Sequence, residues 1–154
     1  MANNYEQGAT SVPASCLAAG GAQAAEEILE HLTQILEYVD YFDSDDRPQR
    51  FDDFYSGCLD VQAQSDGSLY IASGDEYFCA KSFDYLIEKL AERNLILKSF
   101  GIQIAYTCSK PRPDEFGGTY FRAFPCGKVL AMGTQLDDLT DEQFEQIYRI
   151  RTGV

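Results

Sequence analysis

Carboxylates and aromatic rings are concentrated in one short stretch of the sequence, residues 37–57, which reads EYVDYFDSDDRPQRFDDFYSG. The stretch holds seven Asp and Glu and six Tyr and Phe, with only Arg47 and Arg50 as cations. Carboxylates form charge-assisted hydrogen bonds with Arg and Lys, and aromatic rings supply apolar contact in the middle of protein interfaces. The chemistry predicted for this stretch is therefore binding to a basic partner.

The side chains that usually carry catalysis are sparse. His31 is the only histidine, and the helical pattern places it at the edge of an apolar stripe, which favours a partly buried helix residue over a general base. No three or four Cys and His have the spacing of a zinc site, and no Gly-rich phosphate loop precedes a predicted helix. We expect a protein that is not an enzyme and that carries no metal or cofactor.

Net charge is distributed unevenly along the 154 residues. The whole chain has a formal charge of −13, and residues 1–77 hold 15 Asp and Glu against 2 Arg, whereas residues 78–154 hold 10 charges of each sign. Such asymmetry predicts one acidic face, which would repel phosphates and attract basic surfaces. We therefore expect no direct binding to nucleic acid. An acidic surface that serves only solubility is the alternative.

Cysteine usage and hydropathy bear on the compartment. The five cysteines are odd in number, scattered and never in a C-x-x-C arrangement, which favours free thiols in a reducing compartment. They are Cys16, Cys58, Cys79, Cys108 and Cys126. No apolar run approaches the roughly 20 residues that span a bilayer, and the first residues lack the pattern of a signal peptide. We expect a cytoplasmic protein without a membrane partner.

The strongest predicted helix runs from Ala24 to about Tyr41. Apolar residues recur there at three- and four-residue spacing, and Glu26, Glu30, Glu37 and Asp40 cluster on another side of the helix. Pro48 closes this region after a turn-prone acidic cluster. The candidate partner-binding residues are Glu26, Glu30, Glu37, Asp40, Tyr41, Asp43, Asp45, Asp46, Asp52 and Asp53.

The remaining patterns predict an α+β fold. Residues 54–64 and 68–74 alternate as a β-hairpin around Ser65-Asp66-Gly67, and a shorter helix follows Ser82 and ends near Asn94. Three further strands are predicted in 97–108, 118–127 and 128–133, and a third helix in 139–151. We expect a mainly antiparallel sheet of about five strands with three helices packed on it, as a single domain over 23–154 after a flexible N-terminal arm over 1–22.

A second candidate contact is the connection AYTCSKPRPDEFGGTY, residues 105–120. Two prolines and two glycines shape it, and it displays charges of both signs. These charges are Lys110, Arg112, Asp114 and Glu115, and their pairing within a plain hairpin connection is the alternative. The run YTCSKPRPDEFGG, together with the early YEQ at residues 5–7, resembles short acidic proteins carried by bacterial phages and plasmids. The resemblance implies a mobile-element origin and assigns no functional residue.

Together these features predict a mobile-element inhibitor of a host nucleic-acid-handling defence complex, of the anti-CRISPR or antirestriction kind. Its acidic face would occupy a basic channel that otherwise holds DNA or RNA. A generic acidic interaction or scaffolding module, without nucleic-acid mimicry, is the alternative from another class, and a small hydrolase or transferase is a weaker third reading. The oligomeric state is not predicted.

Overall fold

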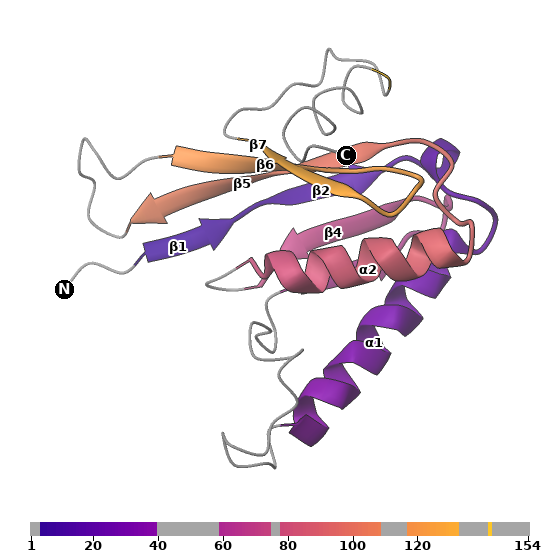
Figure 1. The fold of residues 1–154 in the computed structure, drawn as a ribbon, viewed down its shortest axis with the longest axis horizontal. Helices are drawn as coiled ribbons and strands as arrows, with labels where there is room; N and C mark the ends of the chain where they lie inside the picture. The colour runs from indigo at the N-terminus through magenta and orange to yellow at the C-terminus, as the bar shows by residue number, and fades with distance from the viewer. Residues whose placement is uncertain (1–3, 40–58, 75–77, 109–116, 133–141, 143–154) are drawn as a thin grey trace.

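The computed structural model describes residues 4–39, 59–74, 78–108, 117–132 and 142, and seven strands lie in these ranges (Figure 1). The strands are β1 (Asn4–Gln7), β2 (Ala9–Val12), β3 (Leu59–Ala63), β4 (Leu69–Ser73), β5 (Phe100–Cys108), β6 (Gly117–Ala123) and β7 (Val129–Met132). They form two sheets in which every neighbouring pair is antiparallel. One sheet has the order β1-β5-β6-β7 and the other the order β2-β4-β3.

The N-terminal segment connects the two sheets. β1 pairs with β5 of the first sheet, and after the single residue Gly8 the chain continues as β2, which pairs with β4 of the second. Gly8 exchanges two hydrogen bonds with Ser73, and a Cβ at Gly8 would collide with the carbonyl oxygen of Gln103. Glycine is needed at this position because the backbones of β4 and β5 both approach it closely.

Two α-helices lie to one side of the strands in Figure 1. They are α1 (Gly21–Val39) and α2 (Ala80–Glu92), and a short 3-10 helix, η1 (Ala14–Cys16), precedes α1. Phe83, Leu86, Ile87 and Leu90 of α2 are fully buried because their spacing places them on one helical face. After α2, Asn94 has a φ of 56°, the left-handed conformation that commonly ends a helix.

The main core is built from the inner faces of both sheets, the apolar stripe of α2 and the first part of the stripe of α1, whereas Leu32 and Leu36 form a smaller cluster. Val61 and Ile71 are paired across β3 and β4, and Ile102 of β5 lies in the same buried cluster. At the β6 side, Phe78, Phe83 and Phe121 are in mutual ring contact, with centroids 5.0–6.2 Å apart. These contacts join the two sheets and the helices into one continuous apolar interior.

The predicted α+β class is confirmed, as are the hairpin around residues 65–67 and the left-handed residue at Asn94. The predicted strand number and the single sheet are wrong, because residues 4–12, expected to be part of an N-terminal arm, form β1 and β2 and pair in separate sheets. Their sequence, NYEQGATSV, has little apolar alternation, so only pairing with distant strands defines them. Of the third predicted helix, residues 139–151, only Glu142 is described.

Candidate interaction surface

The exposed side of α1 carries an acidic ridge, defined as Glu26, Glu27, Glu30 and Glu37. All four side chains are exposed, whereas Ile28, Leu32 and Leu36 on the opposite side of the helix are buried. The ridge extends about 16 Å along the axis at the usual rise of a helix. α1 contains no Lys or Arg, and none of the four carboxylates forms an ion pair within the described part of the chain. Among the described residues, the ridge is therefore a negative surface without a compensating cation.

The carboxylates of the ridge differ in their hydrogen bonds to the rest of the protein. Glu26 accepts a hydrogen bond from the backbone N–H of Ala63, at 3.1 Å, through its Oε1 atom. Ala63 is the last residue of β3, so this bond fixes the start of the ridge against the second sheet. Glu30 and Glu37 have no such partner among the described residues. Both side chains are exposed.

The sequence prediction missed one member of the ridge. Glu27 lies 100° from Glu26 around the helix, and the centre of the buried stripe lies on the far side of the axis. The helical period alone was therefore sufficient to predict that Glu27 is exposed on the same side of the helix. The other candidate residues, Asp40, Tyr41, Asp43, Asp45, Asp46, Asp52 and Asp53, lie outside the described residues, as do Lys110, Arg112, Asp114 and Glu115.

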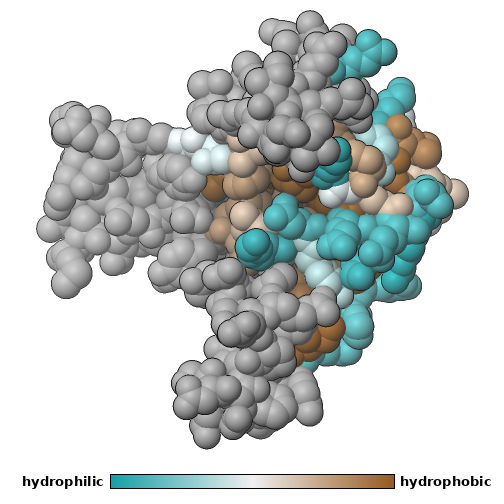
Figure 2. Space-filling model, viewed as in Figure 1, coloured by the Kyte–Doolittle hydropathy of each residue, from teal (hydrophilic) through white to brown (hydrophobic). Residues whose placement is uncertain are grey.

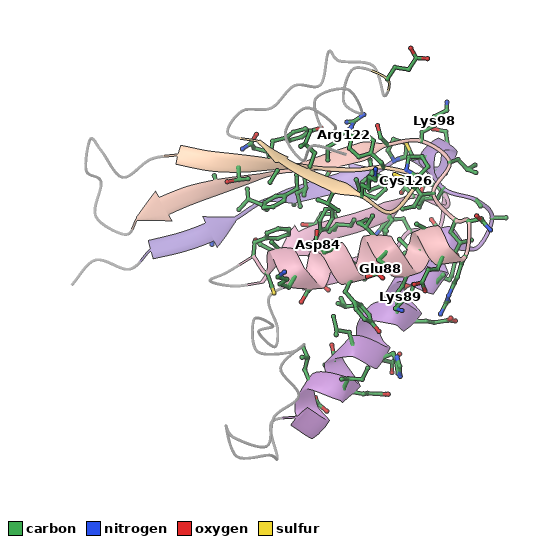
Figure 3. All side chains as sticks on the ribbon, in the orientation of Figure 1. Asp84, Glu88, Lys89, Lys98, Arg122 and Cys126 are labelled. Atoms are coloured by element: carbon green, nitrogen blue, oxygen red, sulfur yellow. The ribbon has the colours of Figure 1, made fainter. Side chains whose placement is uncertain are left out.

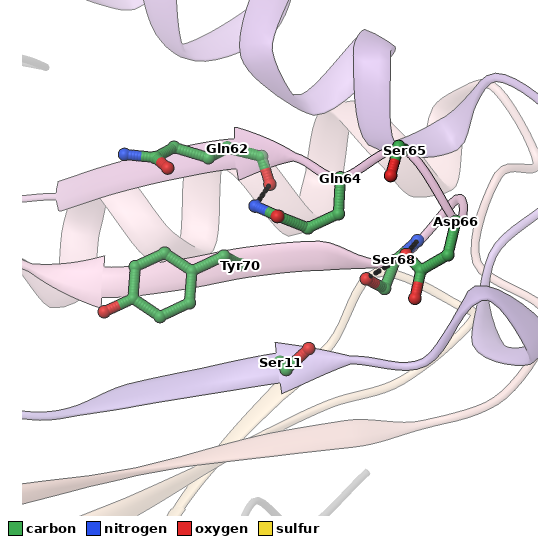
Figure 4. A pocket seen from close by; sticks show the side chains of 7 residues that line it. All are labelled: Ser11, Gln62, Gln64, Ser65, Asp66, Ser68 and Tyr70. Atoms are coloured by element: carbon green, nitrogen blue, oxygen red, sulfur yellow. Dashed lines mark hydrogen bonds between the residues drawn. The ribbon is translucent and has the colours of Figure 1, made fainter.

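A second exposed feature lies on the outer face of the sheet β2-β4-β3. Side chains alternate along these strands, so that Ser11, Tyr70 and Gln62 form one outward row across the three strands. They line an open groove of about 550 Å³ together with Gln64, Asp66 and Ser68 (Figure 4). The alternation of Asp60, Gln62 and Gln64 with apolar residues predicted the β-hairpin that carries this face. None of the groove residues was predicted to bind a partner.

The turn at one end of this groove is held by its own side chains. The Asp66 carboxylate accepts hydrogen bonds from the hydroxyl of Ser68, at 2.6 Å, and from the backbone N–H of Ser68, at 2.9 Å. These bonds, the side-chain one first, lower the pKa of Asp66 below its ordinary value. Gly67 has a φ of 88° and donates its N–H to the carbonyl of Gln64, at 3.1 Å. The turn therefore presents a charged carboxylate at neutral pH.

The surface of α2 has a different charge character. Figure 2 shows hydrophilic side chains over this helix, and Figure 3 places Asp84, Glu88 and Lys89 along it. Lys89 forms an ion pair with Glu92, at 3.3 Å, and lies 5.5 Å from the centre of the Tyr85 ring. Because both signs of charge are interspersed there, α2 lacks the single-sign surface that α1 presents.

Residues suited to catalysis are not brought together in the described part of the chain. His31, expected to be partly buried, is exposed on α1, because it lies beyond the edge of the buried stripe. Cys16 and Cys79 are buried thiols, and Cys126 is an exposed one. Among the described residues, no three His, Cys, Asp or Glu side chains are grouped so that they could hold a metal ion.

None of the described helices combines the length and the apolar character needed to cross a bilayer. Comparison with protein-family models, curated proteins and solved structures found no significant match. A functional proposal therefore depends on the surface chemistry of this chain.

Proposed function

We propose that this protein is an inhibitor that binds a basic, nucleic-acid-binding surface of a host defence complex through an acidic face that takes the place of nucleic acid. The observation that carries the proposal is the acidic ridge, whose four exposed carboxylates stand on a helix without a single Lys or Arg. The concentration of carboxylates in residues 37–57, which begin at the last member of the ridge, adds support to the proposal. The proposal is one of binding and involves no catalytic step.

The physical basis is substitution of one anion for another. A channel that holds DNA or RNA grips phosphates with Arg and Lys, and carboxylates on a rigid helix can form charge-assisted hydrogen bonds with the same side chains. Net charge of −13 on the free protein increases the rate of encounter with such a channel and opposes binding to nucleic acid itself. The inhibitor and the nucleic acid would therefore compete for one surface.

The test is capture of partners from lysate of the bacterial host with the tagged full-length protein, followed by challenge with added DNA or RNA. We expect nucleases or CRISPR effectors among the bound proteins, and we expect nucleic acid to displace them. Raising the salt concentration should weaken the association steeply, because exposed charges are screened within about 8 Å at physiological ionic strength. Retention of the partner in the presence of excess nucleic acid would favour the generic interaction module instead.

Matched variants separate the acidic ridge from overall charge. Glu30→Gln with Glu37→Gln removes two charges from the ridge, and Asp84→Asn with Glu88→Gln removes two exposed charges from α2. We expect the first pair to slow association and the second to leave it nearly unchanged. Equal effects of the two pairs would mean that only net charge matters. Submicromolar binding of the unmodified protein to bare DNA or RNA at physiological salt would contradict the mimicry proposal.

A further inference from the structure

The groove on the outer face of the sheet β2-β4-β3 has the Asp66 carboxylate in its lining and the Asp60 carboxylate beside it. The amide of Gln62 donates to the Asp60 carboxylate, and the amide of Gln64 donates to the backbone carbonyl of Gln62, both at 3.3 Å. The hydroxyl of Ser68 likewise donates to Asp66. These bonds use one N–H of each amide and the hydroxyl of Ser68, and the two ionised carboxylates can only accept hydrogen bonds. A ligand that only donates hydrogen bonds would complement this arrangement.

An exposed aromatic ring lies in the same groove. Tyr70 is 36% exposed, and Figure 4 shows its ring nearly face-on between Gln62 of β3 and Ser11 of β2. The neighbouring outward position on β4 is Ala72, opposite Ala9 of β2, so small side chains adjoin the ring on that side. A planar group can therefore approach the ring face. Cations are attracted to such a face, and guanidinium groups also stack on it.

From these two observations we infer that the groove binds an arginine side chain of the partner, with the guanidinium stacked on Tyr70 and its N–H groups directed to the surrounding oxygens. Guanidinium has five donors and no acceptor, and it is planar. Lysine would satisfy the charge but would not stack. The inference rests on the proposed function only in taking the partner to be basic.

Charge favours a basic partner over a second copy of this chain. The groove has no Lys or Arg among its lining residues, and Asp60 and Asp66 stand on or beside it. Two copies, each with a formal charge of −13, would repel one another at such a face. Glu26 of the acidic ridge is bonded to Ala63 at the end of β3, the strand that carries Gln62 of the groove. One basic surface could contact both.

The experiment compares two peptides of equal charge, nona-arginine and nona-lysine, by fluorescence anisotropy with the full-length protein. We expect tighter binding of nona-arginine. Tyr70→Ala should reduce its affinity about two- to fivefold, the range for an exposed cation–π contact, and should affect nona-lysine less. Tyr70→Phe should retain the preference because it keeps the ring. Leu97→Ala, which truncates another large exposed apolar side chain, serves as the control.

A second variant tests the inference without removing the Tyr70 ring. Gln62→Arg places a cation in the groove and should reduce nona-arginine binding even if Tyr70→Ala folds poorly. Equal affinities for the two peptides, or binding that neither variant changes, would overturn the inference. So would a dimer in sedimentation that Tyr70→Ala dissociates, because a second copy would then occupy the groove. The proposed function is judged separately, by displacement of the host partner with nucleic acid.

Discussion

The carboxylate of Glu26 on α1 accepts the backbone N–H of Ala63 at the end of β3, at 3.1 Å. This bond links the first helix to the edge strand of the three-stranded sheet and positions the acidic ridge beside that sheet. It gives Glu26 a structural role that its exposed neighbours Glu30 and Glu37 lack among the described residues.

Replacing Glu26 should therefore reduce stability, whereas replacing Glu30 should not. Glu26→Ala is expected to lower the free energy of unfolding by about 1 kcal/mol, the typical net contribution of one hydrogen bond. Glu30→Ala, on the same helix face, should change it by less than about 0.5 kcal/mol. Urea denaturation of both variants measures the difference. Glu26→Gln keeps an acceptor oxygen and should recover most of the loss, and equal stability of all variants would show that the bond contributes nothing.

The close approach of Tyr120 to Gly101 should make that glycine intolerant of a side chain. Tyr120 is 1% exposed, and a Cβ on Gly101 would collide with its ring and hydroxyl. The same hydroxyl accepts a hydrogen bond from Arg122, at 2.9 Å, so the ring cannot move without cost. Gly101→Ala should destabilise the protein by about 1–3 kcal/mol, as overpacking does.

A double-mutant cycle tests whether the loss of stability in Gly101→Ala comes from the clash of the added Cβ with Tyr120. Tyr120→Phe removes the hydroxyl, which is among the atoms nearest to the added Cβ. Thermal unfolding should show that Gly101→Ala costs less in the Tyr120→Phe background than in the unmodified protein. Identical costs in the two backgrounds would show that the hydroxyl adds nothing to the clash, which the ring carbons of Tyr120 would then cause alone.

The hydrogen bonds to Asp66 should be visible in its titration. Because Ser68 holds the pKa of Asp66 below its ordinary value, removing the hydroxyl with Ser68→Ala should raise that pKa. NMR detection of the Asp66 carboxyl carbon against pH measures the change. An unchanged pKa in Ser68→Ala would mean that the hydroxyl does not stabilise the ionised form.

The same shift predicts a pH dependence of stability. A carboxylate whose pKa is depressed on folding contributes stability that is fully present above its unfolded pKa, about 4, and is lost as the pH falls through the lower folded value. Between pH 5 and pH 2, the unmodified protein should therefore lose more stability than Asp66→Asn, which cannot be protonated. Parallel pH profiles in chemical denaturation would contradict this linkage.

Thiol accessibility should distinguish three of the cysteines. Cys126 is exposed, whereas Cys16 and Cys79 are buried. Brief alkylation of the native protein, followed by peptide mass mapping, should label Cys126 well before the other two, because a thiol must reach solvent to react. Labelling after denaturation without reductant should modify all three. Early labelling of Cys16 would show that η1 opens readily.

Sequence patterns by themselves determined much of the local structure. Periodicity placed α1 and the buried side of α2, because a helix with one apolar stripe must bury it against a core. Turn chemistry located the β3–β4 hairpin at Ser65-Asp66-Gly67 and the end of α2 near Asn94, since few residues adopt positive φ at low cost. Helical spacing also placed Glu26, Glu30 and Glu37 away from the apolar stripe, and all three are exposed.

Tertiary structure decided what depends on pairing between distant segments. β1 and β2 are short and polar, so nothing local predicts them, and their strand conformation exists through hydrogen bonds to β5 and β4 about 60 to 100 residues away in sequence. The row of Ser11, Tyr70 and Gln62 likewise comes from the register of three strands. The bond from Ala63 to Glu26 spans 37 residues. Such contacts follow from the packing of whole elements, which side-chain periodicity within one segment does not encode.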